Sequence, residues 1–140
     1  MKVKDIMSKE IVSLNSDDSI EKAAQLMKQY DVGSIPICRN NEVIGIVTDR
    51  DITLRSVAKD QGSKLQKVSD IMTSNLVVGD PDMNIHDAAA LMSDKQIRRL
   101  PIIESKNLVG IVALADISLE PSLQDNAEET LKNISKSDEE

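Results

Sequence analysis

The sequence predicts an α/β (α+β) fold made of two copies of one β-α-β-β-α unit. The first observation is an internal repeat: shifted by 65 residues, Val3–Ile52 aligns with Val68–Ile117 without a gap, and 18 of these 50 positions are identical. Roughly three or four identities are expected by chance, so the repeat is a duplication. The second observation is that each copy carries an apolar pattern typical of a helix, followed by two short apolar runs around a polar turn.

Each copy is expected to open with a short strand and a helix. The apolar stretches Ile11-Val12 and Leu76–Val78 predict the strands. Asp18 is expected to cap the first helix, with Glu21 completing a capping box, and Gly33 to end it. The apolar face of the helix comprises Ile20, Ala23, Ala24 and Met27 in the first copy, and Ile85, Ala88, Ala89 and Met92 in the second.

A β-hairpin and a second helix complete each copy. The strands are predicted at Ile35–Cys38 with Val43–Thr48, and at Leu100–Ile103 with Leu108–Ala113. The second helices are expected to begin around Asp49–Asp51 and Ala115–Ile117. We therefore assign residues 1–59 to the first repeat, 60–67 to a linker, 68–120 to the second repeat and 121–140 to an acidic tail.

The tail differs from the repeats in composition. Between residues 118 and 140 there are seven acidic residues and two lysines, a net charge of −5, whereas the whole chain carries −7. An apolar stripe at Leu123, Ala127, Leu131 and Ile134 indicates a short helix that docks on the module or on a second subunit. The final six residues are expected to be disordered.

The composition excludes several classes of function. An acidic chain with no Phe or Trp and a single Tyr lacks both the clustered cations and the aromatic platforms that nucleic-acid binding uses. The single cysteine, Cys38, cannot form an internal disulfide, and no 18-residue apolar stretch or apolar leader occurs. We expect a cytoplasmic protein that binds neither nucleic acid nor membrane.

The order of short motifs resembles a known family. An Asp-Ile-Met opening at 5–7 and 70–72, a proline in the first hairpin strand at Pro36 and Pro101, and Gly45–Asp51 at the end of the second strand are similar to a pair of CBS (cystathionine-β-synthase) domains. The resemblance covers 3–117. It implies two αβ sandwiches packed sheet-to-sheet with pseudo-twofold symmetry and clefts between the repeats that accept adenosine-containing ligands. It also implies a disc-like homodimer.

The key candidate site is the strand-to-helix turn at Thr48–Asp51. A carboxylate there can accept both hydroxyls of a ribose diol, a threonine hydroxyl can add a bond, and the helix start offers free N–H groups. The resemblance assigns Thr48, Asp51 and Asp116 to ribose. Thr48-x-x-Asp51 is also a capping box. In the second copy Ala113 replaces the threonine while Asp116 stays, and a purely capping role gives no special reason to keep only the acid.

Cations near these turns are candidates for phosphate binding. Arg98 and Arg99 precede Leu100-Pro101, whereas the first copy has Gly33-Ser34 there; Arg50 has no counterpart in the second copy. The resemblance implies phosphate contacts for Arg98 and Arg99, and Arg50 is a second phosphate candidate. The sequence alone does not divide the three arginines between the two sites. A solvated surface pair is the alternative for Arg98-Arg99. For the adenine region the resemblance points to Val12, Ser13, Ser34, Ile35, Val77, Val78 and Leu100.

The predicted function is a stand-alone regulatory module that binds AMP, ADP or ATP and signals through dimer geometry or an unknown effector protein. The alternatives are a dimerisation adaptor that binds no ligand, and an S-adenosylmethionine binder. We expect no enzymatic activity, because the single histidine, His86, has no nucleophile at a meaningful spacing. The spacing of metal-binding motifs is also absent, so neither a metal nor a further cofactor is expected.

Overall fold

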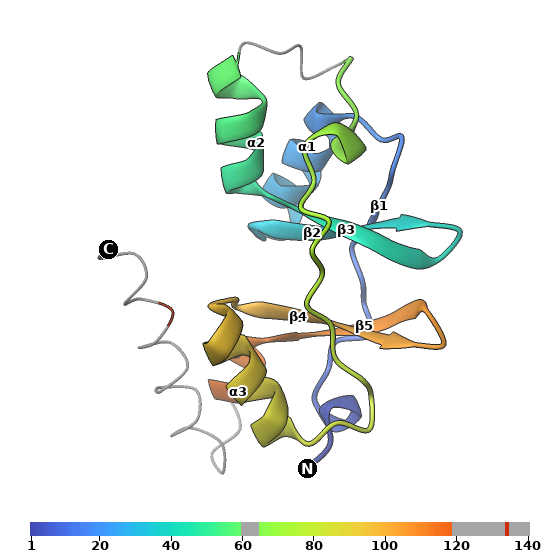
Figure 1. Ribbon diagram of the computed structural model, residues 1–140, viewed down its shortest axis with the longest axis vertical. Helices are drawn as coiled ribbons and strands as arrows, with labels where there is room; N and C mark the ends of the chain where they lie inside the picture. The colour runs from blue at the N-terminus through green and yellow to red at the C-terminus, as the bar shows by residue number, and fades with distance from the viewer. Residues whose placement is uncertain (60–64, 119–133, 135–140) are drawn as a thin grey trace. The chain divides into compact units, whose positions relative to one another are not determined.

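The computed structural model describes residues 1–59, 65–118 and 134. The chain divides into two compact units, one formed by Val12–Leu76 and the other by Met1–Ile11 together with Val77–Glu140 (Figure 1). We call them the Asp51 unit and the Asp116 unit, after the acidic residue of the candidate site that each contains. Both combine helices with a β-hairpin, so the predicted α/β class is confirmed.

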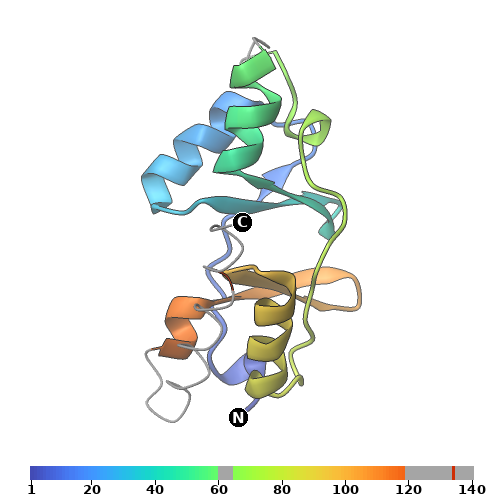
Figure 2. The ribbon, with the colours of Figure 1, turned by 60° about the vertical axis from the view of Figure 1, so that its left-hand side comes forward.

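The Asp51 unit contains three strands and two helices. Strand β1 (Leu14–Asn15) pairs in parallel with β2 (Ser34–Arg39), which pairs antiparallel with β3 (Glu42–Thr48). Helices α1 (Ile20–Tyr30) and α2 (Asp49–Arg55) cover the same face of these strands (Figures 1 and 2). Two 3₁₀ turns, η2 (Val57–Lys59) and η3 (Val68–Asp70), complete the unit. Its buried core consists of Leu14, Ile20, Ala23, Met27, Ile35, Ile37, Val47, Val68 and Ile71.

The Asp116 unit repeats this plan. The 3₁₀ turn η1 (Val3–Asp5) precedes helix α3 (Ile85–Lys95), the antiparallel strands β4 (Arg99–Glu104) and β5 (Asn107–Ala113), and helix α4 (Leu114–Ser118). In place of β1 there is a single parallel bridge between Gly79 and Ile102. The buried core consists of Val3, Ile85, Ala88, Ala89, Met92, Leu100, Ile102, Val112 and Ile117.

The two repeats exchange their opening segments. Val3, at the start of the first repeat, is fully buried among side chains of the second, and its N–H donates to the Met83 carbonyl at 2.9 Å. Val68, at the start of the second repeat, is buried in the core of the Asp51 unit. Fully burying a valine side chain contributes roughly 1.5–3 kcal/mol. Neither compact unit therefore consists of one contiguous sequence repeat.

The opening segments run along the hairpins, where a glycine allows the close approach. Thr73 pairs with Ile46 through N–H···O bonds of 2.8 and 3.0 Å, and Ser8 pairs with Ile111 in the same way. A Cβ atom on Gly45 would overlap the sulfur of Met72 and lie 3.1 Å from the Thr73 carbonyl oxygen. Gly110 is in the equivalent position against Met7 and Ser8. A glycine at each position thus lets the opening segment pack against the strand.

The two hairpins confirm the predicted strand pairs, each strand extending by no more than one residue beyond the predicted bounds at either end. Each loop has two residues, both with positive φ: Asn40 and Asn41 at 53° and 67°, and Ser105 and Lys106 at 50° and 72°. Loops of this kind match the right-handed twist of the flanking strands. Asparagine tolerates positive φ well, whereas serine and lysine adopt it at a cost.

The predicted ends of the first helix are wrong by one or two residues. Ser19, not Asp18, is the N-cap, and its hydroxyl accepts a hydrogen bond from the Lys22 N–H at 3.1 Å. Asp18 instead accepts from the Asn15 N–H at 2.8 Å. The helix ends at Asp31, which adopts the left-handed conformation, two residues before the predicted end at Gly33.

The first strand and one helix face also differ from the prediction. Ile11 and Val12 lie where the chain passes from one compact unit to the other, and the strand forms later, at Leu14–Asn15. On α1, Ala24 is exposed, while the rest of the predicted face is buried. On α3 all four predicted residues are buried. Most of the linker, at 60–64, and the predicted tail helix lie outside the described residues, although Ile134 is buried.

Candidate functional site

The strand-to-helix turn of the Asp51 unit is closed by a capping box. The Asp51 N–H donates to the Thr48 hydroxyl at 3.0 Å, and the Thr48 N–H donates to the Asp51 carboxylate at 3.0 Å. Asp51 is buried, with 8% of its surface exposed. Thr48 and Asp51 therefore do form the capping box that was the alternative to a ribose contact. The capping box fixes the position of the Asp51 carboxylate at the end of β3.

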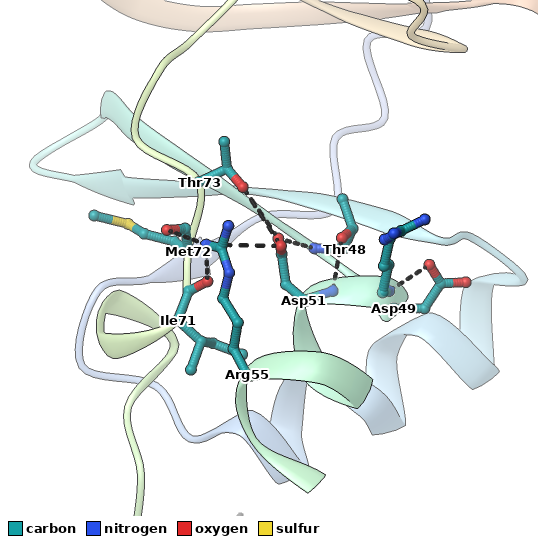
Figure 3. Close-up of polar contacts among 8 residues, drawn as sticks. Thr48, Asp49, Asp51, Arg55, Ile71, Met72 and Thr73 are labelled. Atoms are coloured by element: carbon teal, nitrogen blue, oxygen red, sulfur yellow. Dashed lines mark hydrogen bonds and ion pairs between the residues drawn. The ribbon is translucent and has the colours of Figure 1, made fainter. Parts of the chain in front are cut away.

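Two residues from elsewhere in the unit also reach Asp51. The Thr73 hydroxyl lies 3.4 and 3.5 Å from the two carboxylate oxygens, and an Arg55 guanidinium nitrogen lies 3.8 Å from one of them (Figure 3). The same Arg55 nitrogen donates to the carbonyl oxygens of Ile71 and Met72 at 3.0 and 3.4 Å. Asp51 thus joins α2 to the opening segment of the second repeat.

The amide groups at the start of α2 are occupied by the protein itself. The Asp49 N–H donates to the Gly33 carbonyl at 2.9 Å, and the Arg50 N–H donates to the Asp49 carboxylate at 2.8 Å. With the Asp51 N–H bound to Thr48, the expected free N–H groups are absent from these three residues. These three N–H groups are therefore not available to a ligand in this arrangement.

The turn of the Asp116 unit keeps half of the capping box. The Asp116 carboxylate accepts a hydrogen bond from the Ala113 N–H at 2.9 Å, although Ala113 offers no hydroxyl in return. The acid therefore has a capping role without the threonine, and its retention is no argument for a ligand contact. The assignment of Asp51 and Asp116 to ribose remains a prediction.

The candidate phosphate-binding arginines lie beside these turns. The Leu114 N–H at the start of α4 donates to the Arg98 carbonyl at 2.8 Å, and Arg99 is the register partner of Ala113. Arg98 is exposed and Arg99 is half-buried. Arg50, also exposed, borders a surface hollow of about 390 Å³ lined by Asp49, Arg50, Thr53 and Leu54. No carboxylate of residues 1–59, 65–118 or 134 forms an ion pair with any of the three arginines.

The predicted adenine-region residues have mixed surroundings. Ile35 and Leu100 are fully buried in the two cores, so in this arrangement their side chains serve packing. Val12 and Val77 pack against the cores from the edge and are partly buried. Ser13 and Val78 are exposed, and Ser34 is half-buried at the start of β2. The exposed and half-buried members are the ones that a ligand could reach.

Sequence reasoning missed Thr73 and Arg55. The signal for Thr73 was available: a hydroxyl residue directly follows the repeated Asp-Ile-Met in both copies, at Ser8 and Thr73. The two hydroxyls act differently, because Ser8 donates to the Glu10 carbonyl at 3.4 Å while Thr73 donates to Asp51. No sequence signal marked Arg55, whose contacts depend on the exchanged segment.

Other features that bear on function are few in the described part of the chain. His86 is exposed on α3. Cys38 is buried, and this burial raises the pKa of its thiol. Within residues 1–59, 65–118 and 134, no group of three His, Cys, Asp or Glu side chains could hold a metal ion. In the same ranges no helix has the length and apolar character needed to cross a membrane.

Comparison with known proteins identifies the family. The model of the CBS domain matches residues 3–57 and 68–121. The CBS domain-containing protein YhcV of Bacillus subtilis is 43% identical over 133 residues, which cover 95% of this chain and 94% of that protein. Hypoxic response protein 1 of Mycobacterium tuberculosis is 30% identical over 116 residues, 82% of this chain and 81% of that one.

Solved structures agree with this result. The CBS domain pair of protein MJ0100, in complex with 5′-methylthioadenosine and S-adenosyl-L-methionine, has a TM-score of 0.75 and 30% identity, covering 85% of this chain and 94% of that chain. Two separate matches to one family model, at the offset of the internal repeat, account for both copies. The chain belongs to the CBS domain family and contains a pair of CBS repeats.

Proposed function

We propose that this CBS pair is a regulatory module that binds an adenine nucleotide, AMP, ADP or ATP. The ribose diol binds at the carboxylates of Asp51 or Asp116, and the phosphates bind at Arg98, Arg99 or Arg50. Nucleotide binding alters how two copies of the chain pair, or how the pair contacts an effector protein.

The observation that carries this proposal is the surroundings of Asp116. The Leu114 N–H at the start of α4, between Ala113 and Asp116, donates to the Arg98 carbonyl, and Arg99 is the register partner of Ala113. Neither Arg98 nor Arg99 has a carboxylate partner within residues 1–59, 65–118 and 134. A guanidinium group binds phosphate through charge-assisted hydrogen bonds, and a carboxylate accepts hydroxyl hydrogens. A carboxylate and two guanidinium-bearing residues thus stand at neighbouring backbone positions of this unit, which supports the proposal.

A solved relative supports an adenosine ligand. The CBS pair of protein MJ0100 was solved with 5′-methylthioadenosine and S-adenosyl-L-methionine, which share the adenosine moiety. Neither carries a phosphate, so S-adenosylmethionine binding is a second candidate for this chain. It would use Asp51 or Asp116 and be independent of Arg98 and Arg99.

A third candidate is a dimerisation adaptor that binds no ligand. The contacts of the Asp51 carboxylate favour the adaptor. Thr48, Thr73 and Arg55 all interact with this carboxylate, so its presence is explained by the fold without a ligand. Under this hypothesis the turns are only helix caps. The homodimer, the effector protein and the cytoplasmic location are parts of the proposal that the sequence predicts and that solution experiments would test.

Calorimetric titration separates the three candidates. AMP, ADP, ATP and S-adenosylmethionine are titrated into wild type, Asp51→Asn, Asp116→Asn and the Arg98→Ala/Arg99→Ala double variant. Asparagine keeps an acceptor for the backbone N–H and removes the charge, so the fold is retained. We expect nucleotide binding that weakens in at least one Asp variant and in the arginine variant. Binding unaffected by both Asp changes refutes the ribose assignment, and no binding at millimolar ligand supports the adaptor.

A further inference from the structure

The two strand-to-helix turns carry opposite charge at equivalent positions. In the Asp51 unit the side chains of Asp49, Arg50 and Asp51 sum to −1, and the preceding Gly33-Ser34 adds nothing. In the Asp116 unit the equivalent positions hold Leu114, Ala115 and Asp116, and Arg98-Arg99 brings the sum to +1. The difference of two charges results from substitutions at positions that the duplicated backbone keeps equivalent.

The backbone equivalence is close. The Asp49 N–H donates to the Gly33 carbonyl at 2.9 Å, and the Leu114 N–H donates to the Arg98 carbonyl at 2.8 Å. Positions 33 and 98 therefore hold the same place beside the helix start in their units. One is a glycine and the other an arginine.

The Asp49 carboxylate occupies the space beside that glycine. A Cβ on Gly33 would lie 3.2 Å from Asp49 Oδ2, so the carboxylate lies close to the place where Arg98 begins its side chain in the other unit. Its Oδ1 accepts from the Arg50 N–H, and the residue is exposed at the rim of the hollow that Arg50, Thr53 and Leu54 also line. Figure 3 shows Asp49 directed away from Asp51.

We propose that the two turns divide adenosine ligands by charge: the Asp116 turn takes phosphorylated adenosine, and the Asp51 turn takes adenosine whose 5′ substituent is neutral or cationic. This inference rests on the proposed function and assigns a ligand class to each of its sites. Asp49 is the residue that disfavours phosphate at the Asp51 turn. Arg98 is the residue that favours it at the Asp116 turn.

The size of the effect follows from Coulomb's law. Two unit charges about 6 Å apart in a water-like medium interact by an amount equal to roughly a threefold change in affinity. A phosphate monoester carries about −1.5 to −2 near neutral pH. Removing the charge of Asp49 should therefore strengthen AMP binding at its turn by roughly five- to tenfold and leave adenosine binding unchanged.

The test reads each site separately with adenosine and AMP as probes. Asp116→Asn leaves the Asp51 turn intact, and Asp51→Asn leaves the Asp116 turn intact. We expect adenosine to bind more tightly than AMP to the first variant and AMP to bind more tightly than adenosine to the second. Adding Asp49→Asn to the first variant should raise AMP affinity alone, and adding Arg98→Gln to the second should lower AMP affinity alone.

A matched control shows whether position matters. Glu42→Gln removes one negative charge from the same unit at the far end of β3, six residues or about 20 Å from Thr48. It should leave the ratio of AMP to adenosine affinity unchanged. The preference of the Asp116 turn for AMP should also shrink as salt is added.

Three results would overturn the inference. They are AMP and adenosine binding equally to both single-site variants, the same preference at both turns, or an equal response of both probes to Asp49→Asn. In each case the proposed function survives, because an adenosine compound still binds. If neither adenosine nor any adenine nucleotide binds wild type, the inference and the proposed function fail together.

Discussion

Replacing Gly45 with alanine tests the close contact between β3 and the opening segment of the second repeat. The added Cβ would overlap the Met72 sulfur and lie 3.0 Å from Met72 Cγ and 3.1 Å from the Thr73 carbonyl oxygen. The methionine side chain can move, but the carbonyl belongs to the segment that pairs with Ile46 through bonds of 2.8 and 3.0 Å. Relief of the clash must therefore lengthen those bonds.

The expected loss of stability is the sum of two effects. Overpacking a site of this kind costs about 1–3 kcal/mol, and weakening two backbone hydrogen bonds costs about 1 kcal/mol more. Alanine restricts the unfolded chain and returns about 0.4–1 kcal/mol, since Gly45 has no positive φ. The free energy of unfolding should fall by about 1–3.5 kcal/mol.

Urea unfolding followed by far-UV circular dichroism measures this change. Gly33→Ala is the matched control, because the three atoms nearest to its Cβ all belong to the carboxyl group of the exposed Asp49 side chain, which can rotate away. That variant should remain within about 0.5 kcal/mol of wild type or become more stable. If Gly45→Ala is as stable as Gly33→Ala, the opening segment does not pack against β3 as described.

Three further predictions concern single side chains. Within residues 1–59, 65–118 and 134 the buried hydroxyl of Ser56 has no hydrogen-bond partner, so Ser56→Ala should raise the unfolding free energy by about 1 kcal/mol in urea titration. A loss of stability in this variant would instead show that the hydroxyl has a partner. Lys106→Gly should raise the melting temperature more than Asn41→Gly does, because both residues have positive φ and asparagine tolerates it better; equal shifts would contradict this explanation. A hydrogen bond from Lys4 and the charge of Lys4 lower the pKa of Asp82. The ionised Asp82 therefore stabilises the folded protein at pH values above the ordinary pKa of a carboxyl group, and this contribution is lost as the pH falls through the lowered pKa. Lys4→Gln should raise that pKa in an NMR titration, whereas an unchanged pKa would show that Lys4 is not the cause.

The hairpins and second helices could be predicted from the sequence because their signals are local. A polar turn between two apolar runs indicates which strands pair, and both hairpins formed between the predicted strands. The register shifts within each hairpin, at Ile37/Cys38 and Ile102/Ile103, were not predicted. The helix caps were harder for an equally local reason. Asp18 and Ser19 are both good N-cap residues, and the choice depends on whether the Asp18 carboxylate is already used by the Asn15 N–H.

The exchange of opening segments could not be predicted. Both copies begin with the same Asp-Ile-Met, preceded two residues earlier by a valine, so the apolar pattern is identical. Either segment would present the same side chains to either core, and nothing local distinguishes the two choices. Thr73 lies beside Asp51, and Arg55 contacts Ile71, only because the opening segments are exchanged. The surroundings of Asp51 therefore could not be predicted from the sequence either.

The exchange also sets the order in which the protein can fold during synthesis. The Asp51 unit is one continuous stretch, Val12–Leu76, and all its core residues are available once Leu76 has left the ribosome. The other unit needs Val3 together with Ile117, which are separated by most of the chain. Contacts between such distant residues form slowly, because a long loop must close first. The first residues to be synthesised are therefore among the last to pack into a core. Until the second repeat is complete, their apolar side chains stay exposed and can contact other chains.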